Sequence, residues 1–116
     1  MKDNPYKHLC KKADGLPDGP IREYKSTTIF YSNHESITML TSEPQPGRIY
    51  IGYLIYLQDG HTTNRLPNPA YGYCETQQAA LLYFLGYLLS WSRRFSREAV
   101  DSFLLQIKQN AQTSMF

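Results

Sequence analysis

Arginine and tyrosine side chains are the best candidates for chemistry in this chain. Tyr50 and Tyr56 lie in the segment RIYIGYLIYLQ (48–58), and Arg48 has the same parity. In an extended strand, residues of one parity project from one face. Two rings and a guanidinium on one face can stack on unpaired bases while the cation meets a phosphate, or they can pack against a protein. Arg65, on the next predicted strand, is expected nearby.

A second basic group, Arg93 and Arg94, lies between two predicted helices and is another candidate for contact with an anionic partner. Exposed basic residues at a helix end also favour the helix dipole. The whole chain has 12 Lys and Arg against 10 Asp and Glu, which is not the strong basic excess of a dedicated nucleic-acid domain. The sequence therefore favours a protein partner or a homodimer, with DNA or RNA as the alternative.

Motifs for catalysis and for metal binding are absent from the sequence. The three histidines, His8, His34 and His61, have no HxxxH or CxxC neighbours, so we expect no metal and no cofactor. Cys74 precedes a predicted helix, where the pKa of a thiol can fall, but no base accompanies it. Packing at a strand-to-helix junction is the simpler interpretation. We name no catalytic residue; an enzyme remains open but less favoured than a binding module.

The composition is that of a globular protein. A length of 116 residues fits one domain, and ten of the aromatic residues are tyrosines. Tyrosine suits surfaces that are only partly wet, such as an interface or a thin sheet with one half-buried face. The two cysteines form no disulfide framework, and no signal segment or membrane-length apolar run is visible. We expect a cytoplasmic protein with no membrane partner.

Antiparallel strands are expected across residues 21–66. The preceding residues 1–20 contain several Pro and Gly and predict an irregular or short-helical arm. Short strands are predicted at Thr27–Tyr31 and Ile37–Thr41, and the prolines of EPQPG (43–47) should stop the second of them.

The long strand Arg48–Gln58 should return through a two-residue turn at Asp59-Gly60 to a strand at His61–Leu66, with Gln58 opposite His61. Its core face is predicted to hold Ile49, Ile51, Ile55 and Leu57. The opposite face is also rich in apolar residues, so another element, a second copy or a ligand should cover it.

Two helices are expected within residues 76–110. Thr76 is the expected N-cap of a helix over Gln77–Trp91, and Ser96 that of a helix from Arg97 to about Gln109. The first helix is apolar nearly all round, so a second cover is needed besides the sheet and the last helix. We expect a partner there, with Tyr83 or Tyr87 at the interface. The last helix should bury Val100, Phe103, Leu104 and Ile107.

Within residues 48–90 a strand hairpin leads through a Gly-aromatic turn into YGYCETQQAALLYFL, with Thr76, Ala80 and Leu81 in the key positions. This arrangement resembles small modules in uncharacterised proteins of phages, plasmids and other mobile elements. The resemblance implies a non-enzymatic accessory role and assigns no active site. We therefore predict one α+β domain: a small antiparallel meander of three or four strands, a helix packed across it and a second C-terminal helix.

Overall fold

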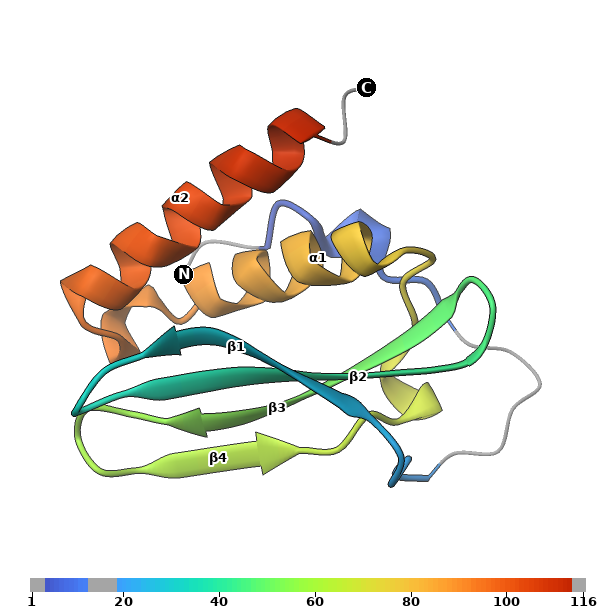
Figure 1. Cartoon of the computed structure of the whole chain (residues 1–116), viewed down its shortest axis with the longest axis horizontal. Helices are drawn as coiled ribbons and strands as arrows, with labels where there is room; N and C mark the ends of the chain where they lie inside the picture. The colour runs from blue at the N-terminus through green and yellow to red at the C-terminus, as the bar shows by residue number, and fades with distance from the viewer. Residues whose placement is uncertain (1–3, 13–18, 114–116) are drawn as a thin grey trace.

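The chain forms one sheet with both long helices on the same side of it (Figure 1). The structure is a computed structural model that describes residues 4–12 and 19–113; positions 1–3 and 13–18 of the expected arm lie outside the described residues. The elements, in chain order, are η1 (Lys7–Leu9), β1 (Lys25–Tyr31), β2 (Ser36–Gln45), β3 (Arg48–Tyr56), β4 (Thr62–Arg65), η2 (Pro69–Tyr71), α1 (Gln77–Leu89), η3 (Ser92–Arg94) and α2 (Arg97–Thr113). None of the described helices is both long and apolar enough to cross a membrane.

The sheet is antiparallel and has the order β1-β2-β3-β4, in which every strand pairs with its neighbour in sequence. Short connections favour such an order because they leave consecutive strands side by side. The predicted α+β fold, an antiparallel meander of three or four strands with two helices, is confirmed, and the sheet has four strands.

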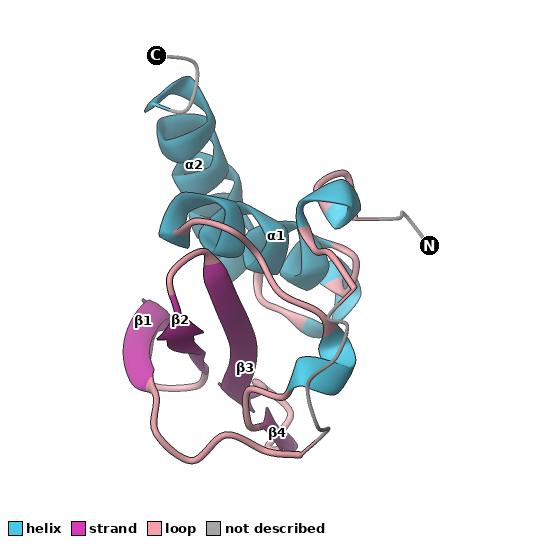
Figure 2. Ribbon diagram, turned by 90° about the vertical axis from the view of Figure 1, so that its right-hand side faces the viewer, coloured by secondary structure: helices cyan, strands magenta, loops and turns pink. Residues whose placement is uncertain are grey.

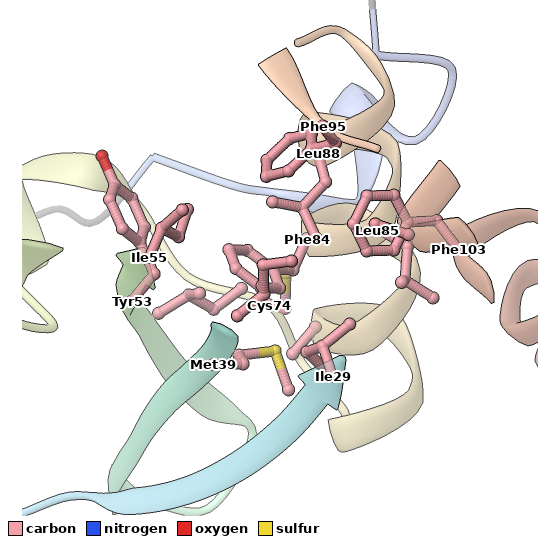
Figure 3. Packing of buried hydrophobic residues seen from close by; sticks show 14 of the residues in the cluster. Ile29, Met39, Tyr53, Ile55, Cys74, Phe84, Leu85, Leu88, Phe95 and Phe103 are labelled. Atoms are coloured by element: carbon pink, nitrogen blue, oxygen red, sulfur yellow. The ribbon is translucent and has the colours of Figure 1, made fainter. Parts of the chain in front are cut away.

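The face of the sheet under α1 forms the core. Ile49, Ile51, Ile55 and Leu57 are buried on it, as predicted, in one cluster with residues of α1. Figure 3 shows Phe84, Leu85 and Leu88 of α1 close to strand residues such as Ile55, Tyr53 and Met39. The alternation of side chains along β3 therefore sets which face the helix covers.

The turn between β3 and β4 differs from the predicted two-residue turn. The amide of Leu57 donates to the carbonyl of His61 at 2.8 Å, and the amide of Gly60 donates to the carbonyl of Leu57 at 3.0 Å. The loop is thus three residues long, and Gln58 does not pair with His61. Gly60 has a φ of 89°, the left-handed conformation with which three-residue loops usually end. The need for glycine was predicted correctly, and the loop length was wrong.

The second strand is longer than predicted and runs through Pro44 to Gln45. The register with β3 shifts between Ser42 and Gln45. A bulge removes residues from the ladder, so Pro44 loses no hydrogen bond that the sheet needs. The prolines were expected to end the strand. Instead β2 continues through Pro44, and only its regular pairing with β3 is interrupted there.

The helix α1 begins where predicted. The side chain of Thr76 accepts a hydrogen bond from the amide of Ala79 at 3.0 Å, which satisfies one free donor of the first turn. The helix ends at Leu89, two residues before the predicted end at Trp91.

The second cover of α1 comes from the N-terminal segment of the same chain. Asn4 donates from Nδ2 to the carbonyl of Tyr83 at 2.9 Å, and a Cβ at Gly86 would collide with the Asn4 side chain and approach the Tyr6 ring at 3.1 Å. Leu82 is buried. The apolar width of α1 therefore does not by itself require a partner, and a partner at Tyr83 or Tyr87 stays a prediction.

The helix α2 is capped as predicted, with Ser96 Oγ accepting from the amide of Ala99 at 3.2 Å. Its buried face is centred on Ala99 and Phe103, and Leu104 is 51% exposed. Gln106 donates from Nε2 to the carbonyl of Ile29 at 2.9 Å, which turns this face of the helix toward β1. The prediction that Leu104 is buried is wrong. The face of α2 that packs on the rest of the protein contains the small Ala99 and the amide side chain of Gln106, and Leu104 lies outside that face.

Candidate binding surface

The outer face of the sheet, opposite the helices, is open at one end. Two cross-strand rows run over it without a charged residue. One row contains Tyr31, Ser36, Tyr56 and Thr62, and the next contains Thr28, Thr38, Leu54 and Asn64. We call these eight residues the Tyr31–Tyr56 face. Figure 2 shows the helices gathered on the other side of the strands.

Two tyrosines dominate this face. Tyr31 is 73% exposed and Tyr56 is 53% exposed, with Ser36 paired to both. Because neighbouring strands lie about 4.8 Å apart, the two tyrosines are about 10 Å apart across the sheet. Sequence reasoning misses Tyr31, since only the strand register places it in one row with Tyr56.

Tyr50 lies on the same side of β3, but it is fully buried, with 0% exposed. Its ring meets Tyr73 edge to face at 6.3 Å between centroids. A ring that stacks on bases must be accessible, so the prediction of Tyr50 as a stacking residue is wrong. Arg48 lies over the ring of Tyr73 at 4.5 Å, so it too is held at this covered end of the sheet.

The cover of this end is the chain that follows β4. A Cβ at Gly52 would come within 2.6 Å of the Pro67 nitrogen and 2.7 Å of the Leu66 carbonyl carbon. The amide of Ile21 donates to the carbonyl of Pro67 at 2.7 Å, which ties a second segment to the first. The apolar second face of β3 is therefore covered by its own chain at one end and is left open at Tyr56.

Arg65 lies at the end of the edge strand β4, on the helix side of the sheet, where it pairs with Tyr53. Its guanidinium carbon is 3.9 Å from the ring centre of Tyr71 and 5.0 Å from that of Tyr53. Such contacts hold an arginine by cation–π attraction. The structure thus separates Arg65 from Arg48 and Tyr56, with which the sequence grouped it.

Tyr83 and Tyr87, predicted at an interface, are partly buried beside Arg65. Burial raises the pKa of Tyr83 to about 12, with Cys10 adding to the shift and Arg65 opposing it. Burial also raises the pKa of Tyr87, and its hydroxyl lies 3.5 Å from that of Tyr53. Phenols are already neutral at pH 7, and the raised pKa values keep both hydroxyls protonated to higher pH, so they act only as hydrogen-bond donors or acceptors there. We call Arg65, Tyr53, Tyr71, Tyr83 and Tyr87 the Arg65 cluster.

Arg93 and Arg94 are exposed in η3. Arg94 lies 3.6 Å from Asp59, which also meets His61 at 3.0 Å. The hydrogen bond from the His61 amide is the main reason that the pKa of Asp59 is lowered. Arg94 is therefore partly matched by an acidic neighbour, whereas Arg93 extends into solvent.

Sequence reasoning also misses Glu35, which is buried although it is charged. Its Oε2 accepts from the amide of Ser96 at 2.8 Å, so the carboxylate caps α2 from the β1–β2 turn. A hollow of about 590 Å³ opens beside it and is lined also by His34, Gln58 and Arg97. A carboxylate at a helix N-terminus satisfies free amides, and this structural role accounts for its burial.

No known protein family, curated protein or solved structure matches the chain. The resemblance of residues 48–90 to mobile-element modules therefore stays a prediction.

Proposed function

We propose that this protein is a non-catalytic binding module that docks a protein partner, or a second copy of itself, through the Tyr31–Tyr56 face. The observation that carries the proposal is the exposure of two tyrosines on an uncharged patch of sheet. Tyrosine is enriched and charged residues are depleted at the centres of protein interfaces. An accessory role of the mobile-element type, which the resemblance implies, belongs to the same proposal.

Binding of DNA or RNA is the second candidate, favoured by the same two exposed rings. Aromatic platforms for single strands combine such rings with cations that follow the phosphates. The eight residues of the face include no Lys or Arg, so the cations would have to come from outside it. This makes a protein the better supported partner.

Photo-cross-linking separates these candidates. A benzophenone amino acid is introduced at position 31 or 56, and at Tyr24 as the matched control, since Tyr24 is an exposed tyrosine outside the face. In the cells that produce the protein, we expect cross-linked protein species from 31 and 56 and not from 24. Products that contain only nucleic acid would support the second candidate, and equal products from all three positions would contradict a specific face.

Self-association is tested by light scattering from low to high micromolar concentration. A dimer held by this face should dissociate in a Tyr31→Ser/Tyr56→Ser variant and persist in Tyr24→Ser. If the dimer interface lies at Tyr83 or Tyr87 instead, the Tyr31→Ser/Tyr56→Ser variant should remain dimeric.

A further inference from the structure

Arg65 carries a charge that the described protein leaves unmatched. Within residues 4–12 and 19–113 its side chain forms no ion pair and donates no hydrogen bond, and the Nε is buried without an acceptor. The ion pairs of that part of the chain involve Lys11, His61 and Arg94 instead. Buried donors are nearly always satisfied. Arg48 Nη1 and the Tyr50 hydroxyl are also buried without a partner, but they lie at the covered end of the sheet, whereas Arg65 is only half-buried and lies on the edge strand β4.

The groups around Arg65 fix the position of its guanidinium but carry no negative charge that would balance it. Tyr71 and Tyr53 lie against the guanidinium with their rings, which constrains the side chain but accepts none of its in-plane N–H bonds. Phenols and thiols are already mostly protonated at pH 7, and burial raises the pKa values of Tyr83, Tyr87 and Cys10 further. None of the three therefore carries a negative charge that could balance Arg65.

We propose that the Arg65 cluster binds a carboxylate, supplied by an acidic side chain of a protein partner or by a small organic acid. A guanidinium that lies over aromatic rings still presents its N–H groups at the edge, and a planar carboxylate meets that edge with two parallel hydrogen bonds. The Tyr53 and Tyr87 hydroxyls share one hydrogen bond, so one of their two O–H groups is left as a further donor. The site is distinct from the Tyr31–Tyr56 face, because Arg65 pairs with Tyr53 on the helix side of the sheet.

The charge of the site favours a carboxylate over a phosphate. One guanidinium surrounded by neutral groups balances one negative charge, whereas a phosphate monoester carries between one and two at pH 7 and is usually held by several cations. A nucleic-acid strand would likewise need a row of cations along its backbone. A second cation for a phosphate would have to come from a neighbouring segment. Lys11, which follows Cys10 in the sequence, already forms an ion pair with Glu75.

The proposal is tested by NMR on the full chain, with the side-chain Nε resonance of Arg65 as the reporter. The probes are a short polyglutamate peptide, acetate, inorganic phosphate and a single-stranded oligothymidine. We expect polyglutamate to shift the Arg65 resonance in a saturable manner. An equal shift by acetate at matched carboxylate concentration would identify a small acid as the ligand, and a shift by the peptide alone would identify an acidic protein segment.

Three variants define the contact. Because these variants lack the Arg65 resonance or change it, their affinity for polyglutamate is measured by isothermal titration calorimetry. Arg65→Gln should weaken binding of polyglutamate about tenfold or more, because it removes a bidentate charged contact. Arg65→Lys keeps the charge but loses the planar fork and should still weaken binding several-fold. Arg93→Gln, at an exposed arginine that forms no ion pair within the described part of the chain, is the matched control and should change the affinity less than about twofold. Thermal melts of each variant check that it is folded.

Several results would overturn the proposal. They are the absence of any shift with polyglutamate, tighter binding of phosphate or oligothymidine than of the peptide, and an equal loss of affinity in Arg93→Gln. Full affinity in Arg65→Lys would show that only the charge matters, which contradicts the planar contact. None of these outcomes bears on cross-linking from position 31 or 56.

Discussion

Replacing Gly52 by alanine should destabilise the protein, although alanine usually favours the folded strand over glycine because it loses less conformational entropy on folding. The new Cβ would lie 2.6 Å from the nitrogen of Pro67 and 2.7 Å from the carbonyl carbon of Leu66, and it would collide with the carbonyl oxygen of Arg65. All three atoms belong to the backbone, so no side chain can rotate away. The segment that follows β4 must therefore move off β3 to make room.

The expected loss of stability follows from two opposing effects. Overpacking of a buried site costs about 1–3 kcal/mol, and contact with backbone alone favours the upper end of that range. Removing a glycine from a strand returns about 0.5–1 kcal/mol of conformational entropy. The net loss is about 2 kcal/mol, which for a chain of this length corresponds to a fall in Tm of roughly 8 °C.

Thermal and urea unfolding measure this loss. The matched control is Ser26→Ala, an exposed position in the same cross-strand row, since Ser26 and Gly52 both pair with Leu40; it should change stability by less than about 0.5 kcal/mol. Because the displaced segment carries Arg65, the Nε resonance of Arg65 should also shift in Gly52→Ala. A variant as stable as the wild type, with that resonance unmoved, would refute the packing of this segment on β3.

Three further predictions concern the core, the cap of α2 and the buried phenol. Ile51→Ala should lower the free energy of unfolding by about 2–5 kcal/mol, as loss of a buried aliphatic side chain does; unchanged urea unfolding would show that the assignment of strand faces is wrong. Glu35→Gln should lower it by about 1–2 kcal/mol, because a charged acceptor for the Ser96 amide becomes a neutral one; an equally stable variant would show that the carboxylate does not cap the helix. Burial raises the pKa of Tyr83 from about 10 to about 12, so the stability it contributes is complete below pH 10 and is lost as the pH rises toward 12. Tyr83→Phe should remove that part of the alkaline loss in a series of melts, and an identical loss in both proteins would contradict the burial of the phenol.

The sequence by itself determined the fold class and the starts of β3, α1 and α2. The parity of Ile49, Ile51 and Ile55 assigns the core face of β3 because side chains alternate strictly along a strand. The N-caps Thr76 and Ser96 lie where a polar side chain can satisfy the first amides of a helix. These are local effects, set by residues a few positions apart, so the sequence shows them directly.

The tertiary structure alone decided which of the candidate residues share a surface. Tyr50 and Tyr56 have the same parity, yet one is buried and the other exposed, because the chain after β4 crosses only one end of the sheet. Tyr31 joins Tyr56 through the register of three strands. Arg65 lies close enough to Tyr83 and Tyr87 to influence their pKa values only because α1 packs on β3, the neighbour of β4 in the sheet. Contacts between distant segments depend on how the whole core closes, and no local pattern encodes them.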